Sequence, residues 1–330
     1  MGATLPSCAM TRWEPDKIRL GISSCLLGDA VRYDGGHKRD AFLVETLGPL
    51  VEWVPVCPEV ELGLGVPRPP IRLVGDDPGA PRLVVEKTGE DLSARMRRWA
   101  GGRLAELGRL GLHGYVLKRG SPSCGLERVR VYGEDGRPGR VGRGLFAAAL
   151  TETLPLLPVE EEGRLTDPGI RESFIERVFA AGRWQAFAAA RPRAGDLVAF
   201  HAAHKFAVLA HSPRHYAALG RLAASAGPRL TAETLHAYGA GFMRALALRA
   251  TRARHVNVLQ HLAGFFKRQL ADDERAELGE TIAEYRRGLV PLVVPLTLLK
   301  HHVRRLRLAY LADQVYLSPH PRELMLRNHV

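Results

Sequence analysis

The chain has 330 residues, of which 46% are hydrophobic and 25% are charged, the composition of a globular protein long enough for two domains. No apolar run is long enough to span a bilayer, and the first residues lack the basic-then-apolar order of a signal peptide. These features exclude a membrane-spanning protein, and we expect a cytoplasmic one that does not bind a membrane.

The formal net charge of +12 is distributed unevenly along the chain. Residues 1–165 contain 23 Lys and Arg against 22 Asp and Glu, whereas residues 166–330 contain 24 against 13. Eleven of the 13 histidines also lie in the second half. This asymmetry favours an anionic partner, with nucleic acid as the first candidate. A well-solvated, arginine-rich surface is the alternative.

Three apolar, strand-like runs each end at a cysteine. They are IRLGISSCL, VEWVPVCPE and GYVLKRGSPSCG, which carry Cys25, Cys57 and Cys124. If the runs are neighbouring parallel strands, the cysteines meet at the sheet edge where open α/β folds bind ligands. Three converging thiolates suit a metal or iron–sulfur site. Taken singly, each cysteine is more often a buried apolar residue than a ligand. Cys8 lies in the leader and is given no role.

Between these runs the sequence alternates turns, strands and helices. Residues 32–36 form a turn, and a short helix from Asp40 closes at Gly48. Three prolines in residues 67–70 keep a rigid loop extended ahead of another strand. A hairpin edge at residues 87–89 precedes an amphipathic helix over 93–110, and the glycine-rich residues 132–146 are read as a loop before a short helix.

The second half is predicted to be mostly α-helical. Its apolar residues recur at helical spacing over 171–190, 196–210, 213–226, 231–250, 254–270 and 272–287, and Pro291 and Pro295 open a further helix. The predicted organisation is a flexible leader (1–16), an α/β domain with a parallel, Rossmann-like sheet (17–160), a linker (161–169) and a helical domain (170–330).

Polar residues close to the cysteines are candidates for chemistry. Glu59, two residues after Cys57, is placed to act as a general acid or base, or else only to cap the following turn. Ser121 and Ser123 are placed to contact a substrate or cluster sulfur, or to satisfy turn amides. The loop that carries Asp34 and Lys38 either lines the pocket or is solvated.

Histidines and cations dominate the helical half. His201, His204 and Lys205 share a helical face, followed by His211 and His215. The spacing permits a metal site, but a phosphate-facing surface is favoured because no carboxylate is interleaved. Phe265 and Phe266 lie among basic residues, and their apolar positions favour core packing over base stacking.

Motifs in both halves resemble known families. The N-terminal half resembles the DUF523, thiouracil desulfidase-type family through SCLLG with RYDGG, VCPEVELGL with PRPP, and LKRGSPSCG. The C-terminal half resembles the DUF1722 family through FHAAHKFAVLAHSP. One departure is ELGLG at residues 61–65, where family members often carry a glycine pair, so the resemblance does not define the shape of the pocket beside Cys57.

The first resemblance implies a [4Fe–4S] cluster held by Cys25, Cys57 and Cys124, and removal of sulfur from a thiolated uracil by non-redox substitution. It implies substrate or sulfur contact for Ser121 and proton transfer for Glu59. Further substrate contacts are expected from Ser24, Asp34, Lys38, Arg119 and Ser123.

The two-domain architecture is similar to tRNA 4-thiouridine desulfidases, which implies that the helical domain binds tRNA and the modified base turns out of its stack into the pocket. The candidate RNA-binding residues are Lys205, Arg249, Arg252, Arg254, Lys267, Arg268, Arg304 and Arg305. The alternatives are a desulfidase for free thiouracil or thiouridine nucleotides and a non-catalytic RNA-binding protein with a cluster. A DNA-repair accessory factor ranks last, and the sequence predicts no oligomeric state.

Overall fold

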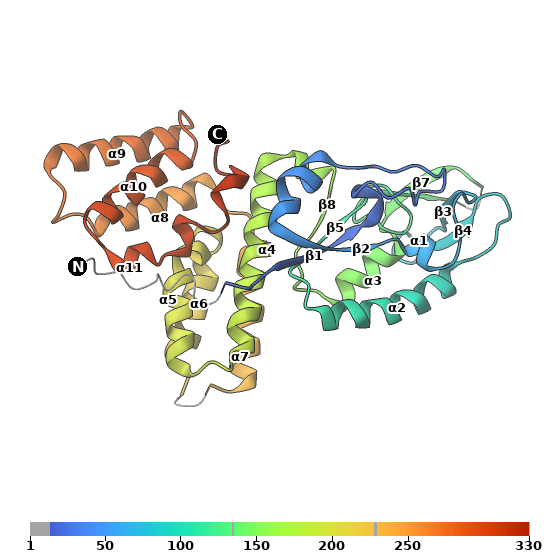
Figure 1. The fold of residues 1–330 in the computed structure, drawn as a ribbon, viewed down its shortest axis with the longest axis horizontal. Helices are drawn as coiled ribbons and strands as arrows, with labels where there is room; N and C mark the ends of the chain where they lie inside the picture. Colours follow the sequence, from blue (N-terminus) through green and yellow to red (C-terminus); the bar gives the residue numbers. More distant parts are fainter. Residues whose placement is uncertain (1–13, 134, 228–229, 330) are drawn as a thin grey trace. The chain divides into compact units, whose positions relative to one another are not determined.

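A computed structural model describes residues 14–133, 135–227 and 230–329 (Figure 1). The described residues form two compact units, Lys17–Ile170 and a second unit made of residues 14–16 and 171–329. Most of the predicted leader (1–16), including Cys8, lies outside the described residues. None of the described helices is both long and apolar enough to cross a membrane.

The first unit is built on a sheet of four parallel strands. In spatial order these are β2 (Val51–Val56), β1 (Ile18–Ser23), β5 (Gly114–Leu117) and β8 (Val159–Glu161). The predicted α/β fold with a parallel sheet is therefore confirmed, with the three cysteine-terminated runs as neighbours. The chain runs from β1 outward to β2, and later from β5 outward in the opposite direction to β8, so the topology switches between β1 and β5.

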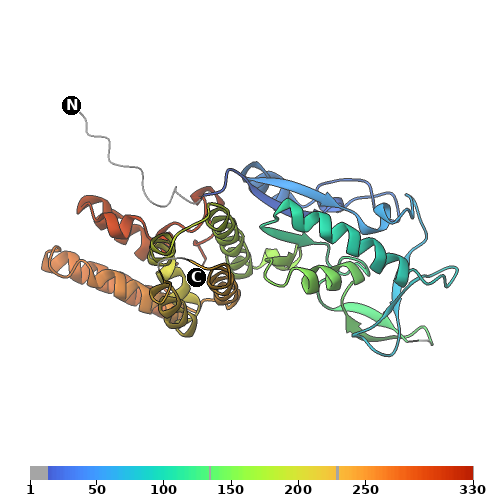
Figure 2. The ribbon, with the colours of Figure 1, turned by 90° about the horizontal axis from the view of Figure 1, so that it is seen from below.

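Two helices cover one face of this sheet, α2 (Ser93–Leu110) and α3 (Leu145–Thr153), which lie side by side in Figures 1 and 2. Leu104, Leu107, Phe146 and Tyr115 are buried between helices and sheet. On β1, a Cβ at residue 21 would lie 2.1 Å from the Tyr115 ring, so the buried ring requires glycine there.

A second sheet has the order β4 (Arg82–Val85), β3 (Ile71–Val74), β6 (Val129–Tyr132), β7 (Pro138–Gly142). Here one prediction is wrong, because residues 132–146 are not a loop: β6 and β7 pair antiparallel as a hairpin. Alternation of Val129 and Val131 with exposed arginine was the strand signal, and the surrounding glycines obscured it.

Short elements connect the strands to the site. They are the 3-10 turns Ser24–Leu26, Gly48–Leu50 and Arg164–Thr166, the π-helical turn Phe42–Leu47, and α1 (Pro58–Glu61). The helix expected after Asp40 is thus a π-helical turn. The predicted linker, 161–169, contains the end of β8 and the start of α4.

The second unit is helical throughout its regular elements, which confirms the predicted class. The helices are α4 (Pro168–Ala189), α5 (Ala194–His211), α6 (Pro213–Ala224), α7 (Ala232–Ala247), α8 (Arg252–Gly264), α9 (Asp272–Arg287), α10 (Val293–Arg305) and α11 (Ala309–Ala312), followed by 3-10 turns Val315–Leu317 and Arg322–Leu324. One core is aliphatic and joins α5, α8, α9 and α10. Another is aromatic and centres on Trp184, which stacks 5.5 Å from Tyr238.

This unit also buries a charged network. Arg327, near the end of the chain, donates to Glu172 at 3.0 Å and to the carbonyl of Tyr316 at 2.6 Å. It also lies 3.7 Å from Glu176, which in turn lies 3.6 Å from His211. Burial disfavours the charge on Glu176, but His211 and Arg327 together hold its pKa well below the usual value. The network ties the C-terminal segment to α4 and α5.

Candidate active site

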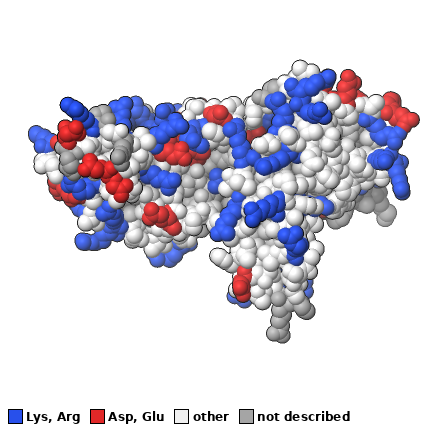
Figure 3. Space-filling view, turned by 180° about the vertical axis from the view of Figure 1, so that it is seen from behind, with Lys and Arg blue, Asp and Glu red and all other residues white. Residues whose placement is uncertain are grey.

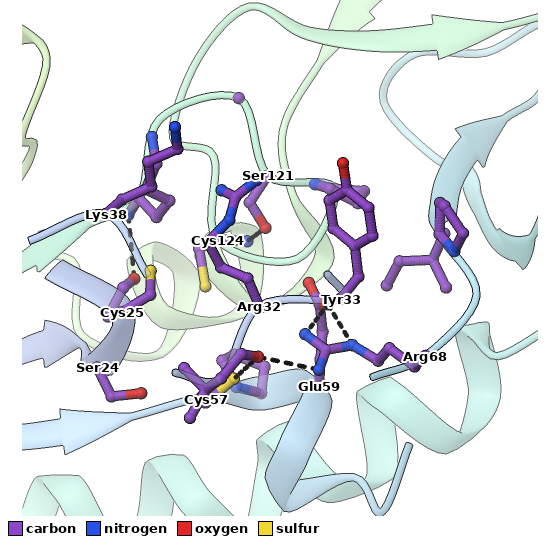
Figure 4. A pocket seen from close by; sticks show the side chains of 18 of the residues that line it. Ser24, Cys25, Arg32, Tyr33, Lys38, Cys57, Glu59, Arg68, Ser121 and Cys124 are labelled. Atoms are coloured by element: carbon purple, nitrogen blue, oxygen red, sulfur yellow. Dashed lines mark hydrogen bonds and ion pairs between the residues drawn. The ribbon is translucent and has the colours of Figure 1, made fainter. Parts of the chain in front are cut away.

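The three cysteines of the first unit line one cavity of about 480 Å³. Cys25 lies in the turn after β1, Cys57 directly follows β2, and Cys124 lies in the Ser-Pro-Ser turn after β5. Figure 4 shows their sulfur atoms turned toward the same space. The cavity opens at the carboxyl edge of the sheet, beside the switch between β1 and β5, where α/β sheets leave a crevice for ligands.

All three thiols resist ionisation in the protein alone. Burial, with a smaller contribution from Cys57, raises the pKa of Cys25 to about 11. Burial also raises the pKa of Cys57, and raises that of Cys124 well above its usual value. Because a thiolate is the form that binds metal, such a site needs a positively charged partner at the sulfur atoms.

Several groups around the sulfur atoms partly offset the rise in pKa that burial causes. A hydrogen bond from Ser23 lowers the pKa of Cys124, and the charges of Lys118 and Arg32 lower that of Cys25. The backbone amides at the start of α1 act in the same direction on Cys57. The carboxylates act the other way: the charge of Glu162 raises the pKa of Cys25, and that of Glu59 raises the pKa of Cys57 and Cys124.

Beside Cys57, Glu59 is held by two partners. The buried Arg68 donates to Glu59 Oε2 through Nε, at 2.9 Å, and through Nη2, at 2.5 Å. Ser123 Oγ donates to Glu59 Oε1 at 3.0 Å. Arg68 Nη1 also donates to the carbonyls of Val31 and Gly65, both at 2.9 Å. Both carboxylate oxygens of Glu59 are thus fixed, and the loops that carry Val31 and Gly65 are tied to it.

Ser121 lines the same cavity from the other side. Its Oγ accepts the backbone N–H groups of Ser123, at 3.2 Å, and Cys124, at 3.1 Å. Since both contacts use its lone pairs, the hydroxyl hydrogen is available to donate toward the cavity. Ser121 both shapes the turn that presents Cys124 and offers a donor to a bound molecule.

The remaining predicted contacts divide into two groups. Ser24, Lys38 and Arg119 line the cavity. Asp34 does not: it is exposed, bonds to Arg32 and accepts the Gly36 amide at 3.0 Å, which lowers its pKa. Ser123 is fully buried and does not line the cavity; it contacts two residues that do, Glu59 through its hydroxyl and Ser121 through its amide.

Several polar residues that line the cavity were not predicted as site residues from the sequence: Ser23, Arg32, Tyr33, Arg68, Glu86 and Lys118. Arg68 lies in the PRPP motif, where an arginine amid prolines was the available signal, but its pairing with Glu59 depends on the fold. Tyr33 keeps 42% of its surface exposed at the cavity, with the Arg32 guanidinium 5.5 Å from its ring centroid. Arg32, Lys38, Lys118 and Arg119 make the lining mainly basic.

The predicted histidine surface of the second unit is wrong for two of its members. His204 and His211 are buried, His204 against the Phe200 ring at 3.9 Å, so neither faces a phosphate. His201 pairs with the Tyr238 hydroxyl at 3.0 Å. Among the residues the structure describes, no group of three His, Cys, Asp or Glu is arranged to hold one metal ion.

The candidate RNA-binding cations lie mainly on the surface of the second unit. Arg249, Arg252, Lys267, Arg268, Arg304 and Arg305 are exposed. Arg254 instead donates to the carbonyl of His211 at 2.6 Å, Arg305 pairs with Glu274, and the Lys205 ammonium lies over aromatic rings. On the face drawn in Figure 3, Lys and Arg cover more surface than Asp and Glu.

The fold and the site define a parallel α/β protein with three cysteines that line one cavity at the carboxyl edge of its sheet. Comparison with known proteins is more specific: the model of the 2-thiouracil desulfurase family matches residues 20–162, and that of the DUF1722 family of unknown function matches residues 205–321. The chain belongs to the 2-thiouracil desulfurase family and carries a DUF1722 region behind it.

Individual proteins align with part of the chain. It is 33% identical over 135 residues to the uncharacterized protein YbgA of Escherichia coli K12, covering 41% of this chain and 80% of that protein. It is 32% identical over 111 residues to the uncharacterized protein YbbK of Bacillus subtilis 168, covering 32% and 71%. A solved structure of the [4Fe–4S]-dependent thiouracil desulfidase TudS is 34% identical, covering 48% of this chain and all of that one, with a TM-score of 0.39.

Proposed function

We propose that this protein is an iron–sulfur-dependent desulfidase that removes sulfur from a thiolated uracil base, with 4-thiouridine in tRNA as its substrate. The net reaction is hydrolytic: water replaces the sulfur at carbon, and uridine and hydrosulfide are released. The observation that carries the proposal is the convergence of Cys25, Cys57 and Cys124 on one cavity with Glu59 and Ser121, in a member of the 2-thiouracil desulfurase family.

The donor set fits a [4Fe–4S] cluster better than a single zinc ion. One zinc would need all its sulfurs about 2.3 Å from one point, and structural zinc sites usually draw their cysteines from close CxxC pairs, which this sequence lacks. Each cysteine of a cluster binds its own iron, which permits wider spacing. Held by three cysteines, the cluster supplies one iron open to the sulfur of a thiocarbonyl, as a Lewis acid.

The protein's own groups divide the remaining work. Glu59, fixed by Arg68 and Ser123, lines the cavity and is placed to accept a proton from the attacking water. The Ser121 hydroxyl donates to a polar atom of the base. Tyr33 offers a ring face for the base, and Arg32, Lys38 and Arg119 offer cations for the attached phosphates.

The tRNA substrate is supported by the second unit. A free nucleobase carries no charge, whereas residues 166–330 hold 24 Lys and Arg against 13 Asp and Glu. Such an excess suits a polyanion, and a tRNA presents both phosphates and a modified base that can turn out of its stack. With a neutral free base as the substrate, the excess of Lys and Arg in residues 166–330 would not contribute to substrate binding.

The test is anaerobic purification with iron reconstitution, followed by incubation with bulk tRNA and, separately, with free thiouracil. Mass analysis of digested tRNA and measurement of hydrosulfide report turnover. Loss of 4-thiouridine from tRNA with equivalent hydrosulfide supports the proposal. Turnover of free thiouracil alone would identify a small-molecule desulfidase, and RNA binding without hydrosulfide would identify a non-catalytic RNA-binding protein.

A further inference from the structure

Two aromatic side chains of the helical unit are exposed beside each other. Phe265, at the end of α8, is 45% exposed, and Tyr310, in α11, is 41% exposed. Their ring centroids are 5.5 Å apart and their planes differ by 33°. Core packing was predicted for Phe265 and Phe266, and it holds for the fully buried Phe266 but not for Phe265.

A third side chain completes the arrangement. The Lys205 ammonium lies 5.2 Å from the Tyr310 ring centroid and 5.0 Å from that of Phe206. Phe206 is buried and meets Phe265 edge to face at 6.3 Å. We call Phe265, Tyr310 and Lys205 the aromatic platform.

The platform is anchored rather than loosely attached. Gln314 donates through Nε2 to the carbonyl of Ala202 in α5, at 3.0 Å, and to that of Tyr310, at 3.2 Å. These bonds join α11 to α5. Rigid aromatic rings lose little conformational entropy when a ligand stacks on them, so an anchored pair is suited to binding.

Cations flank the platform along the chain. Lys267 and Arg268 follow Phe265, and Arg307 precedes Tyr310; all three are exposed. Arg307 has a φ of 52°, a left-handed conformation that favours glycine, yet an arginine occupies it. Asp313 is the acid nearest in sequence to Tyr310. Exposed rings with cations on either side are the combination that binds single-stranded nucleic acid.

We propose that the aromatic platform stacks an unpaired base of the RNA substrate, while Lys267, Arg268 and Arg307 contact the adjoining phosphates. The inference rests on the proposed function and deepens it, because it assigns base recognition as well as phosphate binding to the helical unit. A base offers a π-face to both rings and to the Lys205 charge. A partner held by apolar contact alone would not account for the exposed cations that neighbour both rings in the sequence.

Binding of an unmodified tRNA transcript to the full chain tests the platform without any desulfuration. Phe265→Ala and Tyr310→Ala should each weaken binding about tenfold, since one stacking contact is lost. The slope of log Kd against log salt should stay the same because no phosphate contact is lost, whereas Lys267→Gln should lower it.

Matched variants separate stacking from structural effects. Phe265→Trp and Tyr310→Phe keep a ring and should retain wild-type affinity, whereas Phe265→Leu keeps apolar volume without a ring and should not. Leu289, 64% exposed in the same unit, is the control: Leu289→Ala should leave Kd unchanged. Thermal unfolding of each variant checks that the unit folds.

If the parent chain binds RNA and both Phe265→Ala and Tyr310→Ala bind it with wild-type affinity, base stacking on the platform is refuted. The proposed tRNA substrate would not be affected by that result. Full retention of affinity in Phe265→Leu would also refute base stacking, because apolar contact would then suffice. A change in sedimentation of the Ala variants with unchanged Kd would assign the rings to a contact between copies of the chain. A parent chain that binds no RNA would refute both the platform and the tRNA substrate.

Discussion

Cys25, Cys57 and Cys124 are the residues on which the proposed chemistry depends. Replacing any one by serine should abolish both the brown absorbance of the reconstituted protein and hydrosulfide release, because the proposed cluster is held by these three cysteines alone. Iron and sulfide content, with absorbance spectra, measure the first effect. Cys8→Ser is the control and should keep both. A variant of the three that retained a full cluster would remove that cysteine from the ligand set.

Glu59 separates catalysis from cluster binding. Glu59→Gln keeps the size of the side chain but removes its basicity, so kcat should fall about 10²- to 10⁴-fold while the cluster absorbance persists. Glu86, which also lines the cavity, provides the matched control, and Glu86→Gln should cost less than tenfold. Equal losses in both variants would argue against proton transfer by Glu59.

At the residue scale, some of the site residues could be predicted from the sequence and others could not. The cysteines could be found because each ends an apolar run, and the order of runs in a parallel sheet makes such ends meet. Arg68 could not be assigned, since its contact with Glu59 requires the proline loop to fold back onto the start of α1. Asp34 shows the converse: its loop was recognised, but its side chain turns to Arg32 and the Gly36 amide.

At the scale of single elements, β1 depends on Gly21. Gly21→Ala would place a methyl group 2.1 Å from the Tyr115 ring, so unfolding free energy should drop by about 1–3 kcal/mol or more. Gly102, exposed in α2 with no atom near its Cβ position, is the comparison. Gly102→Ala should stabilise the protein by up to about 1 kcal/mol. Chemical denaturation measures both, and a neutral Gly21→Ala would contradict this account of the packing.

The helices of the second unit should lose stability as the pH falls below about 6.5. Burial lowers the pKa of His204 and His255 to about 3 and that of His320 to about 4. Between those pKa values and about pH 6.5 the unfolded chain binds more protons than the folded one. Each of these histidines therefore lowers the free energy of unfolding by about 1.4 kcal/mol for each unit by which the pH falls. His211, whose pKa is raised by Glu176 against the effect of burial, acts in the opposite direction.

Thermal unfolding at pH 7 and pH 5.5 tests this dependence. His204→Phe should make the loss of stability with falling pH shallower, because one buried histidine no longer titrates. His301→Phe, at an exposed position, should leave the dependence as it is. An unchanged dependence in His204→Phe would show that protonation of His204 does not drive the loss.

Helices and strands were predicted best where the apolar residues recur with a single spacing over the whole segment. The helices of the second unit were recognised because their apolar spacing recurs over many turns. The β6–β7 hairpin was missed because glycine, proline and arginine crowd a short segment whose pairing with β3 is set by residues far away in the chain. The π-helical turn at Phe42–Leu47 carries helix-like spacing and could not be told from an α-helix.

At the scale of the whole molecule, turnover of thiolated tRNA and of free 4-thiouridine should depend differently on salt concentration. Raising salt from 50 to 200 mM should reduce kcat/KM on thiolated tRNA more than tenfold, because each phosphate contact releases counterions. Turnover of neutral free 4-thiouridine should hardly change, which serves as the internal control. Arg268→Gln with Arg304→Gln should flatten the tRNA response, whereas Arg193→Gln should not. Equal salt responses on both substrates would refute a polyanion-binding role.

Every residue assigned here to the reaction lies within Lys17–Ile170: the cysteines, Glu59 with Arg68 and Ser123, and Ser121. The cations of the second unit contribute none of that set. Under the proposed function, the first unit would hold the chemistry and the second would deliver the substrate. Natural selection could then exchange the delivering module, and an engineer could join the first unit to another RNA-binding module to direct sulfur removal to a chosen transcript.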